Sequence, residues 1–137
     1  MKRILLALLV IGTTIGLSSC TKEYITNSLP GVSYVLAVKQ GDWQLQSGTD
    51  RYKTTISMPQ LDSRYFEDGD VSVAISYDND KTAYKLIPAV IRNYSYEASY
   101  RVGSVEIEAT EVGTNPTIVP PGDMLVKIVL TDAEIGN

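Results

Sequence analysis

Histidine is absent from the 137 residues, and cysteine occurs once, at Cys20. Without histidine the chain lacks the usual base of a catalytic triad, the commonest transition-metal ligand and the side chain that titrates near neutral pH. A single cysteine permits no disulfide within the chain, so an apolar core must hold the fold. The sequence also has no glycine-rich phosphate loop and no Cys/His metal-ligand spacing. We therefore expect a protein that is not an enzyme and holds neither a cofactor nor a metal.

Positive charge is also scarce. Twelve Lys and Arg residues stand against sixteen Asp and Glu, a formal net charge of −4 at pH 7, and residues 20–137 alone carry −6. Proteins that bind nucleic acid carry basic patches that replace phosphate counterions. Adhesion to anionic lipid by charge alone likewise needs basic residues. The balance argues against nucleic acid and favours a neutral or cationic partner.

The first seventeen residues have the pattern of an export signal. Lys2 and Arg3 precede an unbroken apolar run over 4–11, which relaxes into small residues by Leu17. A basic start followed by such a run predicts a secretory signal peptide. The stretch 4–17 counts fourteen residues, shorter than the ~20 that a transmembrane helix needs.

Leu17, Ser18, Ser19 and Cys20 follow directly. They resemble the bacterial lipobox, in which small residues precede a cysteine that becomes the lipidated first residue of the mature protein. The resemblance implies a lipoprotein signal peptide over 1–19 and an acyl anchor on Cys20. One acyl chain binds a membrane only marginally, so a lasting anchor implies several. No Asp follows Cys20, a pattern similar to that of outer-membrane lipoproteins, and we expect a lipid-anchored protein of the cell envelope, at the outer membrane.

Two further segments follow the signal. Residues 20–31 mix polar residues with Pro30 and Gly31 without a sustained period, and we expect a lipidated N-terminus and flexible tether. Over 32–137 apolar and polar residues alternate in short runs separated by turn formers, which is typical of strands. The sequence predicts one all-β domain, an antiparallel β-sandwich of about seven strands, with a small β-barrel as the alternative. We expect strands near 34–39, 43–45, 52–58, 71–77, 82–87, 95–102, 105–112 and 124–131.

Three local patterns refine this prediction. Asp62 precedes a segment with helical spacing, so it is the expected N-cap of one short helical turn between two sheets. The strand at 124–131 is apolar on both faces, which favours a central position. Val102 to Val105 fits a two-residue hairpin with Gly103 at the first central position of a type II′ turn. That turn would place Tyr100 opposite Ile107 and Arg101 opposite Glu106.

Carboxylates are the remaining candidates for catalysis or metal binding. Glu106 and Glu108 share a strand face about 7 Å apart, a separation found in inverting glycosidases. Because every i, i+2 pair on a strand meets this distance, a solvated face is the favoured interpretation. The run 78–80, Asp-Asn-Asp, resembles the opening of a calcium loop, but Ala89 occupies the position where the bidentate Glu belongs. A hairpin turn explains the run better.

Tyrosine is the aromatic in excess, with nine residues against one Phe and one Trp. A tyrosine combines an apolar ring with a polar tip, which suits half-buried sheet faces and the rims of sites for neutral ligands. Ordinary strand packing would also account for them, because Tyr is favoured in strands. The candidates for a ligand-binding aromatic surface are Trp43, Tyr84, Tyr94, Tyr96 and Tyr100.

Several strand and turn features together resemble small Gram-negative lipoproteins of unknown function, each a lone β domain behind a lipobox. They are Trp43-x-Leu45, Pro59-x-Leu61, the strand with Val71, Val73 and Ile75, Leu86-Ile87-Pro88, Pro120-Pro121-Gly122 and Val126-Lys127-Ile128-Val129. The resemblance implies fold and location and carries over no catalytic residue. Two functions are expected: a non-enzymatic structural or protein-binding module acting through a sheet edge or the 113–123 loop, or a glycan-binding module that uses exposed Tyr and Trp.

Overall fold

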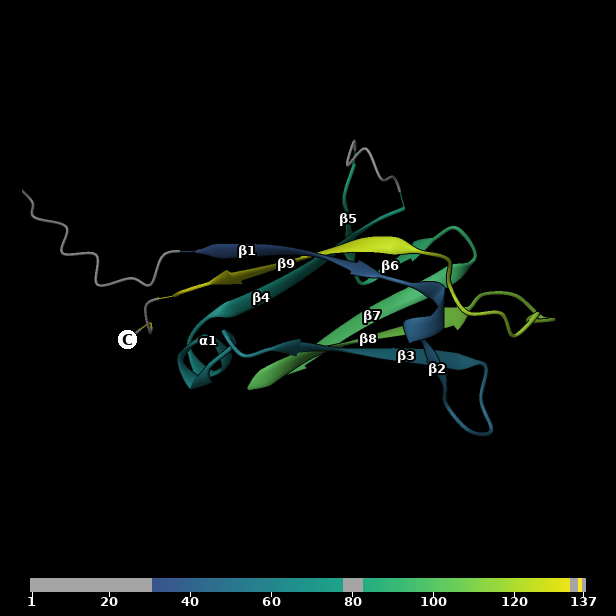
Figure 1. Cartoon of the computed structure of the whole chain (residues 1–137), viewed down its shortest axis with the longest axis horizontal. Coiled ribbons are helices and arrows are strands. Elements are labelled where there is room, and N and C mark those ends of the chain that lie inside the picture. Colours follow the sequence, from purple (N-terminus) through teal and green to yellow (C-terminus); the bar gives the residue numbers. More distant parts are fainter. Residues whose placement is uncertain (1–30, 78–82, 134–135, 137) are drawn as a thin grey trace, which may run out of the picture.

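Two antiparallel sheets pack face to face in the computed structural model, which describes residues 31–77, 83–133 and 136 (Figure 1). The four-stranded sheet has the order β1 (Val32–Val38), β9 (Met124–Thr131), β4 (Asp70–Ser76) and β5 (Lys85–Ile87). The five-stranded sheet has the order β2 (Gln44–Leu45), β3 (Arg51–Met58), β8 (Gly103–Glu111), β7 (Tyr94–Arg101) and β6 (Ala89–Ile91). The predicted antiparallel β-sandwich is confirmed. It has nine strands within the described residues, and two of them are short edge strands on either side of Pro88.

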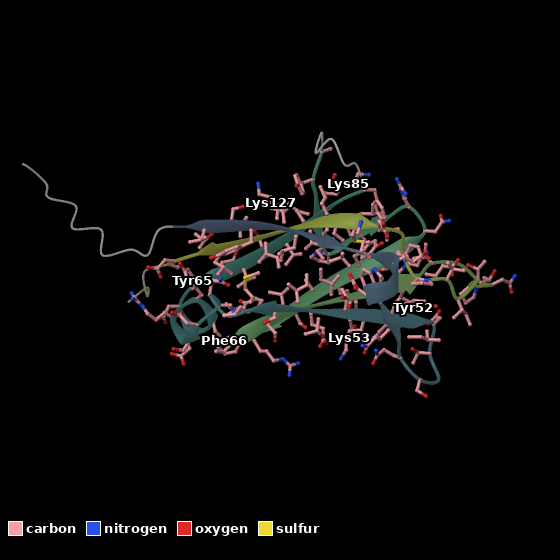
Figure 2. All side chains as sticks on the ribbon, in the orientation of Figure 1. Tyr52, Lys53, Tyr65, Phe66, Lys85 and Lys127 are labelled. Carbon is pink, nitrogen blue, oxygen red and sulfur yellow. The ribbon has the colours of Figure 1, made fainter. Side chains whose placement is uncertain are left out.

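Alternation of buried and more exposed residues, clearest in β9, builds the core between the sheets. In β9 the side chains of Met124, Val126, Ile128 and Leu130 are buried, while those between them are half-buried. β9 lies between β1 and β4, so its predicted central position is confirmed. Figure 2 shows Lys85 and Lys127 on one outer face and Lys53 on the other, which keeps charge out of the core.

Four connections carry the described chain from one sheet to the other, and the last of them is the 113–123 loop between β8 and β9. The first runs from β1 through the 3₁₀ turn η1 (Gln40–Asp42) to β2, and the second runs from β3 through the helix α1 (Ser63–Glu67) to β4. The third crosses at the cis peptide bond before Pro88, between β5 and β6. Pro88 ends β5 as the sequence predicts, since proline has no N–H to donate to a ladder. The expected turn over 78–81 lies outside the described residues.

Asp62 caps α1 as predicted. Its Oδ1 accepts hydrogen bonds from the backbone N–H groups of Arg64 (3.0 Å) and Tyr65 (3.2 Å), two donors that have no partner within the helix. The Tyr65 ring is buried. The helical turn therefore joins the two sheets at one end of the sandwich and packs an aromatic side chain into it.

The β7–β8 hairpin has a different register from the predicted one. Tyr100 faces Val105 and Arg101 faces Ser104, so the predicted pairing of Tyr100 with Ile107 and of Arg101 with Glu106 is wrong. Gly103 has φ +85° and occupies the second central position, as a type II turn requires. Val102, 56% exposed, takes the first central position instead of pairing. The register moves by two residues, which keeps every side chain on its predicted face.

Candidate functional site

The sandwich has four sheet edges, and three of them are protected. An edge strand presents free backbone N–H and C=O groups, and proteins guard it by shortness, charge or proline. β2 has only two residues. β5 and β6 have three each and share Pro88 between them, and Lys85 adds a charge to β5. Each of these three strands is too short to be a template for a long added strand, although β3 beyond Lys53 also lies open on the β2 side.

β1 is the fourth edge and has no such protection. It spans seven residues, Val-Ser-Tyr-Val-Leu-Ala-Val, without a charge, a proline or a glycine. All seven pair with β9 on one side. No described strand pairs with the other side. Its outward-facing residues include Val35, which is 43% exposed. β1 is therefore a long and uncharged edge.

A groove of about 500 Å³ lies between β1 and β3 on this open side. Its lining includes Leu36 and Val38 from β1 and Thr54 and Ile56 from β3. The groove is open because the ladder of β2 with β3 stops at Lys53, so the following part of β3 has no strand beside it in the described structure. Leu36 and Ile56 are only half-buried against the core. The edge thus combines free backbone groups with an apolar recess.

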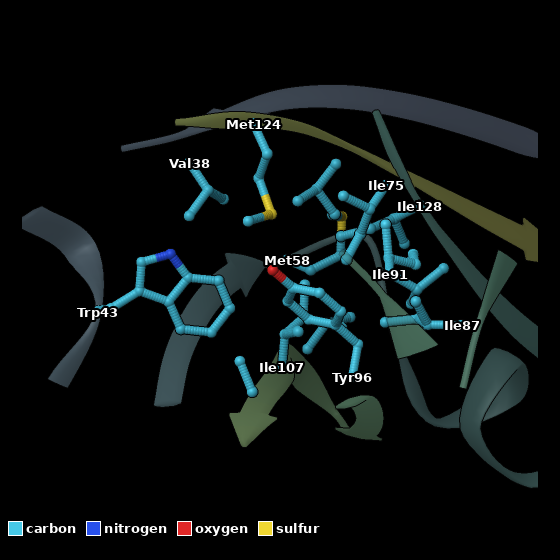
Figure 3. Close-up of a cluster of buried hydrophobic side chains, with 14 of the residues drawn as sticks. Val38, Trp43, Met58, Ile75, Ile87, Ile91, Tyr96, Ile107, Met124 and Ile128 are labelled. Atoms are coloured by element: carbon cyan, nitrogen blue, oxygen red, sulfur yellow. The ribbon is translucent and has the colours of Figure 1, made fainter. Parts of the chain in front are cut away.

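The structure divides the five candidate aromatics between the core and the surface. Tyr96 is fully buried and Trp43 is 6% exposed, with 6.3 Å between their ring centroids (Figure 3). Tyr94 is half-buried, and its ring centroid lies 6.0 Å from that of Tyr96. The Tyr94 hydroxyl donates a hydrogen bond to the carbonyl of Val119. Tyr84 and Tyr100 are also half-buried, and Tyr100 packs edge-on against Phe66. The structure does not bring these rings together as an exposed platform.

A second pocket, of about 410 Å³, lies beside Tyr77, which contacts the buried Tyr96. Its lining includes Lys85, Arg92 and Tyr77, and the Arg92 guanidinium stacks 4.0 Å from the centroid of the Tyr77 ring. The hydroxyls of Tyr77 and Tyr96 are hydrogen-bonded to each other. Burial raises the pKa of both phenols above 10. They are protonated at neutral pH and unsuited to act as general bases, which need a pKa near 7.

The acidic strand face is occupied by ion pairs. Across the β3–β8 ladder, the Glu106 carboxylate lies 3.1 Å from the Lys53 ammonium nitrogen. The Glu108 carboxylate lies 3.0 Å from a guanidinium nitrogen of Arg51. Residues 78–80 lie outside the described part of the chain. Within the described part, no group of three potential metal ligands gathers. Each of the two carboxylates is therefore paired with a cation of the neighbouring strand, on a partly exposed sheet face.

The 113–123 loop is held against the sandwich at several points. The Tyr52 hydroxyl donates to the Ile118 carbonyl (2.9 Å), and the Glu111 carboxylate accepts from the Thr117 backbone N–H (2.8 Å). At its far end Asp123 accepts from the Gln40 backbone N–H (2.9 Å), which lowers the pKa of this carboxyl, and the Lys39 ammonium nearby lowers it further. The loop therefore presents its exposed apolar side chains from a fixed position.

Comparison with known proteins gives no family. No family model, curated protein or solved structure matches this chain. Sequence reasoning named a sheet edge as a binding surface without choosing among the four. The signal for β1 was present, because 32–38 is a seven-residue strand run without a charged residue. What the sequence lacked was the strand order that puts this run at an edge.

Proposed function

We propose that this chain is a lipid-anchored protein of the cell envelope, at the outer membrane, that binds a protein partner through β1 and catalyses no reaction. The observation that carries the proposal is the unguarded seven-residue edge. An extended segment that pairs with such an edge gains backbone hydrogen bonds along its length, and neighbouring pockets select its side chains. The groove beside Leu36 and Ile56 supplies such a pocket.

The anchor rests on the sequence before the domain. Cys20 follows an apolar run and small residues that resemble a lipobox. Val32, the first residue of β1, comes twelve residues later, and an extended tether of that length spans at most about 40 Å. Within the described residues, no helix is long and apolar enough to cross a membrane. Anchored through Cys20, the domain would hold the β1 edge within reach of partners at the membrane surface.

The anchor predicts a change of cell fraction. Cys20→Ser removes the thiol that would carry the lipid, so the chain should move from the membrane fraction to the soluble fraction. Ser19→Ala, which keeps a small residue before the cysteine, should leave the chain in membranes. Immunoblots of the separated fractions measure both variants. Tight membrane association of the Cys20→Ser chain would refute the anchor.

The binding edge predicts a site-specific crosslink. A photoreactive amino acid in place of Val35 lies on β1, and the same residue in place of Val90 lies on the guarded strand β6. Both valines are exposed, by 43% and 63%. Irradiation of intact membranes should give a discrete protein adduct at position 35 and none at position 90. An absence of adducts at position 35, or equal adducts at both, would contradict binding through β1.

A further inference from the structure

We propose that the partner of β1 is a second copy of this chain, paired antiparallel across a two-fold axis at Val35. The two four-stranded sheets would then continue into one sheet through β1 and its symmetry mate. This inference rests on the proposed function, because it names the partner of the same edge. A two-fold interface uses one surface twice, so the β1 edge must be complementary to itself.

The sequence of β1 meets that condition. An axis at Val35 pairs all seven residues and sets Tyr34 of each copy opposite Leu36 of the other. Both side chains lie on the inner face and are half-buried in the single chain. Cross-strand pairs of an aromatic and an aliphatic side chain stabilise antiparallel sheets. On the outer face Val35 meets its own copy and Ser33 meets Ala37, all small or β-branched residues that pack without a clash.

The β1 edge has no charged side chain that would oppose a second copy. Residues 20–137 carry a formal net charge of −6, so net charge opposes the association of two copies. β1 has no charged side chain, and the lysine that follows it, Lys39, is already paired with Asp123 at 3.3 Å. Like charges opposite each other destabilise a ladder, and the pairing of β1 with itself avoids them. Two copies can therefore pair along β1 without placing like charges opposite each other.

The tether length is compatible with two anchors in one membrane. Antiparallel pairing places the starts of the two β1 strands about 20 Å apart. Each tether over 20–31 reaches up to about 40 Å, so both Cys20 residues can lie in the same bilayer. Chains confined to one membrane meet at a raised effective concentration, which favours association through an edge of modest area.

Cysteine crosslinking tests the pairing in the anchored protein. With Cys20 acylated, Val35→Cys supplies the one free thiol of the chain, and the axis sets it beside its own copy at a Cβ separation of about 4.5–5.5 Å. Mild oxidation of membranes should convert this variant to a disulfide-linked dimer. Val90→Cys, on the guarded edge of the other sheet, should stay monomeric.

Sedimentation of the soluble Cys20→Ser chain gives the affinity. Val35→Lys places two ammonium groups together at the axis and should weaken the dimer by about tenfold or more. Ala37→Lys, also outward-facing on β1, should weaken it too, whereas Val90→Lys should not. Circular dichroism checks that each variant is folded.

The outcomes separate this inference from the proposed function. A chain that stays monomeric, with its position-35 photoadduct formed to a different protein, would overturn the second copy and leave binding through β1 standing. An adduct between position 35 and residues 21–30 of the same chain would show that the tether covers the edge. That result would also overturn pairing with a second copy. The absence of any adduct at position 35 would overturn both.

Discussion

Replacement of Tyr96 with alanine is expected to lower the free energy of unfolding by about 3–5 kcal/mol, the range for truncation of a large buried aromatic. Tyr96 is fully buried, and its ring lies 6.3 Å from the centroid of Trp43 and 6.0 Å from that of Tyr94. Truncation would empty the middle of this cluster (Figure 3) and leave the Tyr77 hydroxyl without its partner. Urea unfolding followed by circular dichroism measures the loss.

Two matched variants separate packing from hydrogen bonding. Tyr96→Phe keeps the ring and removes the hydroxyl, so it should cost about 0.5–1.5 kcal/mol, the net value of one hydrogen bond, because the Tyr77 hydroxyl that loses its partner is only half-buried. Tyr100→Ala removes a tyrosine that is half-buried on the same strand, and it should cost less than Tyr96→Ala. If Tyr96→Ala cost no more than Tyr100→Ala, Tyr96 would not be a central core residue.

The alternation of apolar and polar residues was sufficient to predict the sandwich. It assigns each side chain to one face whichever strands are neighbours, while the central position of 124–131 was predictable because that strand is apolar on both faces. The cap at Asp62 was predictable because a capping side chain bonds to backbone only two or three residues away. Local patterns therefore carried most of the fold.

The register of the β7–β8 hairpin shows where local patterns fail. Val102 has the composition of a strand residue, so the sequence favours a turn that keeps it in the ladder. The structure instead exposes Val102 in the turn and seats Gly103, with φ +85°, at the next position. Both turns leave every side chain on the same face, so hydrophobicity cannot distinguish them. Packing of the whole sheet selects the register.

The candidate site depended on information that is not local. In sequence Trp43 and Tyr96 are not distinguished from the half-buried candidates, but the crossing from β1 to β2 folds Trp43 inward against Tyr96. The same limit applies to β1, because its uncharged sequence is visible while its edge position depends on the strand order β1-β9-β4-β5. Tertiary topology decides which uncharged strand lies at an edge and is open for binding.

Replacement of Gly69 with alanine is expected to destabilise the protein by about 1–3 kcal/mol, the usual cost of forcing an extra carbon into a packed site. Gly69 follows α1, and a Cβ built on it would lie 2.5 Å from the Thr131 carbonyl oxygen and 2.9 Å from that of Tyr65. Both neighbours are backbone, so relief requires α1 to move away from the end of the central strand β9. The change also stiffens the unfolded chain, which offsets part of the cost by about 0.4–1 kcal/mol.

Gly41→Ala is the matched control for that loss, and the pair isolates the steric effect of the added carbon. A Cβ at Gly41 meets nothing within 4 Å, and its φ is outside the left-handed range. Only the effect on the unfolded chain remains, so this variant should gain about 0.4–1 kcal/mol. Thermal and urea unfolding of both variants measure the difference. Equal stability of the Gly69→Ala and Gly41→Ala proteins would mean that α1 is not held in tight backbone contact with β9, and that this end of the sandwich yields without cost.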